Sequence, residues 1–177
     1  MSPSAPFRRI LVPTDFSVPA ERAWSLAQCL ARAADSELVL VHVVPGSWLP
    51  IARAGDASEA VRKWAAEELE DCAGKALAQG LRVRVALRTG VAYREIVALA
   101  REDGADLIVV ATLGRGGIGR ALLGSVADRI MRLAPCPVLT VPEPAAGEAL
   151  SRRGGSGKVS TTAIPRPRSD RTAIAPW

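Results

Sequence analysis

The sequence has few aromatic residues, cysteines and histidines. Aromatic side chains make up 4% of the 177 residues, so a core must be aliphatic and rich in alanine. The three cysteines, Cys29, Cys72 and Cys136, are widely spaced and form no C-x-x-C pair, so neither a disulfide framework nor a zinc site is indicated. A reducing compartment is expected. The single histidine, His42, lies in an apolar run and is interpreted as a packed side chain, which leaves a histidine-based triad without a source.

Several segments that would mark other classes of protein are missing. The N-terminal MSPSAPFRRI lacks the apolar centre of a signal peptide, and no apolar run approaches the roughly 20 residues of a membrane helix. We therefore expect a cytoplasmic protein without membrane contact. The Walker signature G-x4-G-K-[ST] is absent, and no carboxylate cluster indicates a magnesium-dependent phosphoryl-transfer centre or another metal site.

Positive charge is concentrated near the C-terminus. The net charge is +5, and residues 143–177 hold six basic and three acidic side chains, so the rest of the chain is close to neutral. Nucleic-acid binding is therefore not expected of the body. Gly, Ser, Arg, Pro and Thr dominate 143–177, which predicts a disordered tail. We expect a flexible lead over residues 1–6 and one folded domain over 7–142.

Short apolar runs alternate with helical patterns along that domain. Right-handed crossovers between such units give an α/β fold with a doubly wound parallel sheet and helices on both faces, as in Rossmann-like proteins. The alternating arginines of the third run indicate a strand with one wetter face near the sheet edge. Five strands, with four helices between them, are expected over Phe7–Val12, Leu38–Val44, Leu81–Leu87, Leu107–Val110 and Pro137–Val141.

The stretch from Asp106 to Val126 carries the strongest functional pattern. A β-branched apolar strand is followed by a glycine-rich loop and by a helix that Ser125 and Asp128 are expected to cap. This order places backbone N–H groups and the positive end of a helix where a phosphate can bind. Arg115 can reach such a phosphate or remain a solvated loop arginine. Gly114–Gly119 also matches G-x-G-x-x-G by letter, but it follows the fourth strand, which argues against a dinucleotide site.

Five segments together resemble the universal stress protein family. Ala111-Thr-Leu-Gly114, nine residues and then Gly124-Ser125 resemble its nucleotide loop, Gly-x-x-Gly-x9-Gly-Ser/Thr. Ala111 stands where the pattern has glycine, and alanine keeps the N–H but disfavours a positive φ. The other segments resemble the family's strands and cover, with the loop, about residues 7 to 142: Ile10-Leu-Val-Pro-Thr-Asp15-Phe-Ser17, Val39-Leu-Val-His42-Val43, Ala105-Asp106-Leu-Ile-Val-Val and Ala134-Pro-Cys136-Pro-Val-Leu-Thr-Val141.

The resemblance implies strand order 3-2-1-4-5 and ATP, with or without Mg²⁺, as ligand. Asp15, in the turn with Pro13 and Thr14, would hold adenine or ribose, and Val43 would contact adenine through its backbone. The phosphates would be wrapped by Val110, Ala111, Gly114, Gly124, Ser125 and Val126, with Arg115 in reach. Family members commonly dimerise through the last strand, here Val138–Val141, and an apolar edge strand favours such a partner.

Purely structural roles are the alternatives for these residues. Asp15 can equally be a turn and helix-entry residue, the Ser125 hydroxyl can be occupied as a helix cap, and the loop can be a structural connection. Independently of the resemblance, the carboxyl ends of strands one and four meet at the switch point of such a sheet. Two segments about a hundred residues apart, at Asp15 and Ala111–Gly114, should therefore face one crevice.

We expect an ATP-binding stress-response protein that acts as a nucleotide-dependent switch or sensor, since no catalytic constellation is assembled. The first alternative is an interaction module with the same fold that binds no nucleotide. The second is a slow ATPase or nucleotidyl transferase. Nucleic-acid binding through the basic tail is a weaker hypothesis.

Overall fold

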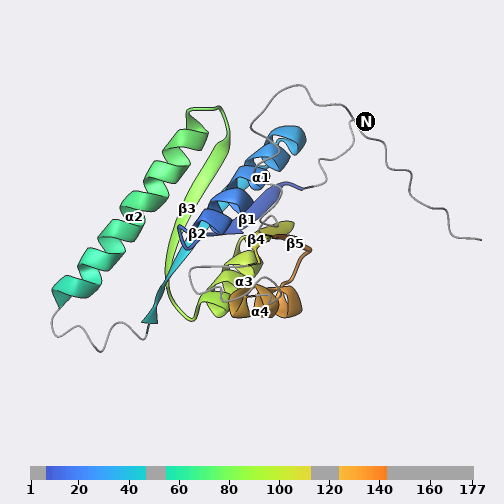
Figure 1. Cartoon of the computed structure of the whole chain (residues 1–177). Helices are drawn as coiled ribbons and strands as arrows, with labels where there is room; N and C mark the ends of the chain where they lie inside the picture. The colour runs from blue at the N-terminus through green and yellow to red at the C-terminus, as the bar shows by residue number, and fades with distance from the viewer. Residues whose placement is uncertain (1–6, 47–54, 113–123, 143–177) are drawn as a thin grey trace, which may run out of the picture. The chain divides into compact units, whose positions relative to one another are not determined.

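The computed structural model describes residues 7–46, 55–112 and 124–142 (Figure 1). The chain divides into two units, Met1–Glu143 and Pro144–Trp177, and every element below belongs to the first. The elements alternate along the chain as β1 Arg9–Pro13, α1 Val18–Ala34, β2 Glu37–Pro45, α2 Gly55–Leu77, β3 Arg82–Gly90, α3 Ala92–Glu102, β4 Leu107–Ala111, α4 Ser125–Leu133 and β5 Val138–Val141.

The five strands form one parallel sheet in the order β3-β2-β1-β4-β5. This confirms both the doubly wound α/β fold and the strand order expected from the sequence. β3 lies at one edge and β5 at the other, because the chain moves outward from β1 in one direction and then crosses back to β4. Among the described residues, no helix is long and apolar enough to cross a membrane.

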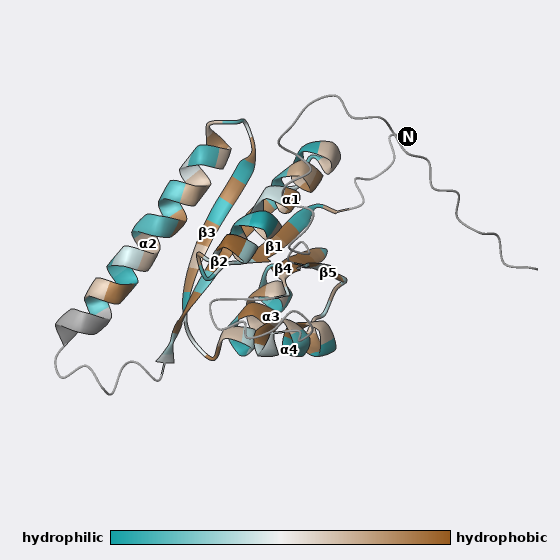
Figure 2. Cartoon of the chain, viewed as in Figure 1, coloured by the Kyte–Doolittle hydropathy of each residue, from teal (hydrophilic) through white to brown (hydrophobic). Residues whose placement is uncertain are grey.

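Two aliphatic cores lie on the two faces of the sheet. Successive strand residues point to opposite faces, so Ile10 and Val12 pack with α1 and α2, whereas Leu11 packs with α3 and α4. Helices α1 and α2 thus cover one face and α3 and α4 the other (Figure 1). Figure 2 shows the central strands in hydrophobic colours, while each helix alternates between apolar and polar residues. The polar sides of the helices face away from the sheet, as amphipathic helices in α/β domains do.

The helix starts differ from the sequence expectation at one point. Ser17 caps α1, since its Oγ accepts a hydrogen bond from Ala20 N at 3.4 Å. The capping signature at Ser125 is wrong: Gly124 is the N-cap of α4, and Ser125 is its first helical residue. The Gly124 carbonyl accepts the first helical bond, from Asp128 N at 2.9 Å.

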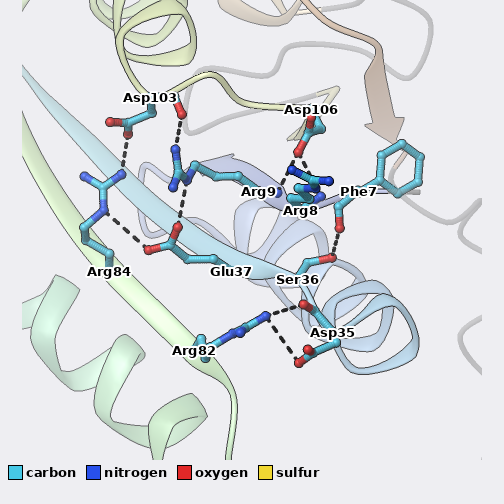
Figure 3. A network of polar contacts seen from close by, with 10 residues as sticks. All are labelled: Phe7, Arg8, Arg9, Asp35, Ser36, Glu37, Arg82, Arg84, Asp103 and Asp106. Atoms are coloured by element: carbon cyan, nitrogen blue, oxygen red, sulfur yellow. Dashed lines mark hydrogen bonds and ion pairs between the residues drawn. The ribbon is translucent and has the colours of Figure 1, made fainter. Parts of the chain in front are cut away.

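The amino edge of the sheet is held by a network of ion pairs (Figure 3). Arg9 Nε donates to Glu37 at 2.7 Å, and Arg84 pairs with both Glu37 and Asp103. The Asp106 carboxylate accepts hydrogen bonds from the backbone N–H groups of Arg8 and Arg9, at 2.8 and 2.9 Å. This network ties β1, β2, β3 and the α3–β4 turn together at one edge. The candidate site lies at the opposite, carboxyl edge.

Candidate functional site

The turn after β1 continues the β1–β2 ladder beyond the last residue of the strand. Thr14 N donates to Val41 O at 2.8 Å, and the Thr14 carbonyl lies 2.8 Å from His42 Nδ1. Pro13 is buried, whereas Thr14 and Asp15 are half-buried. These two contacts fix the position of the turn relative to β2, and Asp15 therefore lies at the carboxyl edge of the sheet. His42, on β2, is packed against this turn, in agreement with its interpretation from the sequence.

Asp15 performs the turn role that the sequence left open beside a ligand role. Its Oδ1 accepts hydrogen bonds from Ser17 N, at 3.1 Å, and from Ser17 Oγ. Because Ser17 in turn caps α1, Asp15 orders the start of that helix. A contact of Asp15 with adenine or ribose stays a prediction.

Phe16 adopts an unusual backbone conformation next to Asp15, with φ at +60°. A bulky side chain seldom occupies this left-handed region. The Phe16 ring lies 4.6 Å from the His42 ring and 5.4 Å from the Trp64 ring, centroid to centroid. These aromatic contacts pack Phe16 against β2 and α2. Sequence reasoning missed Phe16, because nothing in the sequence pattern indicates a positive φ at a phenylalanine.

The end of β4 shows why alanine is compatible with position 111. Ala111 is the last residue of β4 and pairs with Val141 of β5. Among the described non-glycine residues, positive φ occurs at Phe16 and Asp35 and not at Ala111. The extended backbone suits alanine, so the departure from the family's glycine introduces no strain here.

The chain leaves the sheet at Thr112 and returns at Gly124. Thr112 N donates to Val141 O at 3.1 Å, and Gly124 N donates to Thr112 O at 2.7 Å. The two ends of the connection are therefore fastened to each other and to β5. Gly114 and Arg115, both expected at the phosphates, lie outside the described residues.

The strands separate at the switch point. The β1–β4 ladder pairs Ile10 with Leu107 and Leu11 with Ile108 and goes no further, whereas the β1–β2 ladder continues to Pro13 and Val41. Parallel sheets bind ligands where neighbouring connections leave in opposite directions. The shortened β1–β4 ladder is the geometric sign of that opening, and it brings the Asp15 turn and the end of β4 to the same edge.

Val43 lies on β2 and Val110 on β4, the two strands next to β1. Their side chains are 8% and 6% exposed and pack into the core beneath α3 and α4. Only their backbone groups can therefore face a ligand. This agrees with the backbone role that the resemblance implies for Val43.

The N-terminus of α4 is capped by backbone alone. Among the described residues, no side-chain hydrogen bond caps this helix. Ser125 is exposed, and Val126 is 37% exposed. Because the cap is Gly124, the alternative that capping occupies the Ser125 hydroxyl is wrong. A helix start with free N–H groups and an exposed hydroxyl can accept an anion.

A second polar cluster, which sequence reasoning missed, joins α3 to α4. Tyr93 Oη accepts a hydrogen bond from Arg94 Nε at 3.0 Å, and the Arg129 guanidinium lies 4.8 Å from the centre of the Tyr93 ring. The pKa of Tyr93 is lowered, first by the hydrogen bond from Arg94 and then by Arg129, since both cations favour the phenolate. Tyr93 and Arg129 are far apart in sequence, so the spacing of residues did not indicate that they are in contact.

Metal ligands and cysteine thiols give no further candidate site among the described residues. No group of three or more His, Cys, Asp or Glu side chains that could hold a metal ion occurs within residues 7–46, 55–112 and 124–142. Burial raises the pKa of the Cys72 and Cys136 thiols, which keeps them protonated and weakly nucleophilic.

Comparisons with known proteins agree on one family. The family model described as Universal stress protein family matches residues 6–142. Universal stress protein MJ0531 of Methanocaldococcus jannaschii is 35% identical over 148 residues, covering 78% of this chain and 84% of the relative. The solved structure of MJ0577 of the same organism superposes with a TM-score of 0.73 at 26% identity, covering 78% of this chain and 98% of that chain.

Two further solved structures hold nucleotides. A universal stress protein from Archaeoglobus fulgidus in complex with dAMP matches at 26% identity with a TM-score of 0.57, covering 75% of this chain and 96% of that one. A universal stress protein in complex with cAMP matches at 27% identity with a TM-score of 0.58, covering 77% and 97%.

Proposed function

The chain belongs to the universal stress protein family, and from this premise we propose that it binds ATP at the carboxyl edge of its sheet. Binding would make it a nucleotide-dependent switch or sensor in a stress response, without strong catalysis. The observation that carries the proposal is the opening between β1 and β4, where the ladder stops after Leu11 and Ile108. The dAMP and cAMP complexes of two neighbours support an adenine nucleotide as the ligand class.

In the proposed complex, the adenosine end lies toward β1 and β2. Asp15 has carboxylate oxygens that can accept from ribose hydroxyls or the adenine amino group, and Pro13 and Thr14 fix its height above the sheet. Val43 contributes backbone groups, because its side chain is committed to the core. The half-buried position of Asp15 strengthens such hydrogen bonds relative to bulk water.

The phosphates would bind at the start of α4. Val110 and Ala111 end the preceding strand, and Ser125 and Val126 present N–H groups and one hydroxyl at the positive end of the helix. Gly124, whose own N–H is bound to Thr112 O, has no side chain and would let a phosphate approach the cap closely. Gly114 and Arg115 belong to the same proposed cradle by sequence. Mg²⁺, if it accompanies ATP, would be held mainly by phosphates and water, as Mg²⁺ at nucleotides commonly is.

A homodimer through β5 is part of the proposal. β5 is a sheet edge with Leu139 36% exposed, and Val138 and Val141 are only partly buried. An open apolar edge favours pairing with a second copy. Sedimentation over a range of concentrations would report such a dimer as a doubling of mass.

The proposal is tested by titrating the protein with ATP, in the wild type and in Ser125→Ala. We expect the substitution to weaken ATP binding about tenfold, because it removes a hydrogen bond to a charged phosphate. The melting temperature without ligand should not change, since Ser125 is exposed and is not the N-cap.

The matched control is Ser25→Ala, an exposed serine within α1 whose hydroxyl donates to Glu21 O at 2.9 Å. It should leave ATP affinity unchanged. A wild-type protein that ignores ATP would favour the alternative of an interaction module with an empty site. Release of phosphate or adenylate above background would favour the slow ATPase or nucleotidyl transferase.

A further inference from the structure

Two arginines from different helices converge on one tyrosine at the α3–α4 contact. Arg94 Nε donates to Tyr93 Oη at 3.0 Å, and the carbon centres of the Arg94 and Arg129 guanidiniums lie 5.8 and 4.8 Å from the Tyr93 ring centre. Tyr93 is the only tyrosine of the chain, and it packs at the border of the core beneath α3 and α4. The cluster therefore concentrates two positive charges on one rigid, anchored ring.

These two charges are not neutralised by nearby acids. Within the part of the chain that the structure describes, Arg94 and Arg129 form no ion pair. Five other arginines do: Arg9, Arg82, Arg84, Arg88 and Arg132. The acids of the neighbouring helical turns, Glu95 and Asp128, lie against other residues. Asp128 pairs with Arg132 at 3.1 Å, and the Glu95 carboxylate lies against Gly90, where an added Cβ would meet its Oε1 at 2.8 Å. The cluster therefore attracts an anion from outside the fold.

The cluster stands next to the residues proposed to hold phosphate. Arg129 follows Ser125 by four residues on α4, so the two side chains lie on the same side of the helix, about 5–6 Å apart at Cβ. Tyr93 is the second residue of α3, which begins directly after the carboxyl end of β3. Both positions belong to the carboxyl edge of the sheet, and the first turns of α3 and α4 meet there.

We propose that Arg94 and Arg129 form a second anion site, which binds the terminal phosphates of a nucleoside triphosphate held at α4. The inference rests on the nucleotide site proposed above. It predicts that this site binds nucleoside triphosphates more tightly than monophosphates. In AMP the single phosphate follows the adenosine directly and therefore lies on the β1 side of the proposed cradle, farther from Arg94 and Arg129 than the terminal phosphates of ATP. A triphosphate is long enough to meet both guanidiniums, which suit phosphate oxygens through paired N–H donors.

The competing account is structural. Arginine over an aromatic ring is a stabilising contact in itself, and Tyr93 with Arg129 can simply fasten α3 to α4. That role predicts a loss of stability on substitution and an equal effect on every nucleotide. The selectivity role predicts that the response depends on the number of phosphates.

The experiment measures the affinities of the full chain for ATP and for AMP, in the wild type, Arg129→Gln and Arg94→Gln. We expect each substitution to weaken ATP about tenfold, the effect of losing one hydrogen bond to a charged group, and to leave AMP unchanged. Arg129→Lys keeps the charge without the planar fork and should recover part of the ATP affinity. Arg132→Gln is the matched control on the same helix, because its side chain is already paired with Asp128.

Each outcome decides between the accounts. A wild-type ratio of ATP to AMP affinity that survives in both variants overturns the second anion site and leaves the nucleotide site standing. Equal weakening of ATP and AMP also overturns it, in favour of the structural role. A wild type that binds neither nucleotide overturns the nucleotide site and this inference together.

Discussion

Ala111 is the residue at which the sequence departs from the family's nucleotide loop. It closes β4 in extended conformation, pairs with Val141 and packs half-buried against the core of α1 and α2. Its N–H is the group that a phosphate-binding role would use, and alanine retains it. The methyl group of Ala111 therefore packs into the core beside the sheet and does not disturb the proposed site.

Replacement by glycine tests this interpretation. Ala111→Gly should lower the free energy of unfolding by about 0.5–1 kcal/mol, because glycine loses more backbone freedom on folding. ATP affinity should stay unchanged, since no positive φ is needed. Chemical denaturation and an ATP titration measure the two effects.

The control for this substitution is Ala86→Gly in β3, which faces Val41 within the sheet. It should cost similar stability without touching the carboxyl edge. Markedly tighter ATP binding in Ala111→Gly, absent in Ala86→Gly, would mean that alanine obstructs the ligand.

Residue-level features that depend on distant partners could not be predicted. Phe16 has a positive φ, and its ring packs against His42 and Trp64 from other elements. The Tyr93–Arg129 contact joins two helices. The capping error at Ser125 has a local cause: serine and glycine both serve as N-caps, and the pattern does not say which of two neighbours does.

At the scale of elements, the order of strands and helices followed from the sequence. The hydrophobic runs found all five strands, and the alternating arginines of β3 marked it as an edge strand. The predicted ends of the strands were less accurate, because a strand continues as far as the neighbouring strand offers it hydrogen-bond partners. β3 extends to Gly90 since β2 runs on to Pro45, with which Gly90 pairs.

The amino-edge network was not predicted, although its residues are visible as separate charges. It unites side chains from β1, β2, β3 and the α3–β4 turn (Figure 3). The hydrogen bond from Arg9 to Glu37 raises the pKa of Arg9, because the carboxylate favours the charged guanidinium. We infer that the network fixes edge strand β3, which otherwise relies on β2 and α2.

A double-mutant cycle between Arg84 and Asp103 measures this contribution. Their side chains are 42% and 18% exposed, so we expect a coupling of about 0.5–1 kcal/mol in the free energy of unfolding, at the upper end for surface pairs. Urea unfolding of the wild type, Arg84→Ala, Asp103→Ala and the double variant gives the value.

The pair Lys75–Asp71 on α2 is the comparison, at 2.6 Å but 70% and 62% exposed. As an isolated and highly exposed helix pair, it should show a smaller coupling than Arg84–Asp103, because solvent screens its charges. A coupling for Arg84–Asp103 no larger than this would show that the network adds nothing beyond an ordinary surface pair.

At the scale of the whole molecule, the fold separates two tasks. Ion pairs and the Asp106 carboxylate close the amino edge of the sheet, while the opening between β1 and β4 lies at the carboxyl edge. Asp15 and the end of β4 lie at that edge, as the sequence predicted from topology. Val43, Val110, Gly124 and Ser125, which the family resemblance named, lie at or beside it. The predicted tail, 143–177, and loop residues Gly114 and Arg115 lie outside the described residues.

The most direct test of the central claim is thermal unfolding with and without millimolar ATP and Mg²⁺, for the wild type and for Gly124→Val. Gly124 has φ −58° and ψ 142°, which valine can adopt, so the variant should fold while its side chain crowds the proposed phosphate position. At a hundredfold excess over Kd, ligand binding stabilises the native state by about 2.7 kcal/mol, or roughly 5–10 °C for a domain of this size. We predict that shift for the wild type and a much smaller one for the variant. An equal shift in melting temperature in both proteins would show that the nucleotide does not bind at the start of α4. No shift in the wild type would contradict nucleotide binding itself.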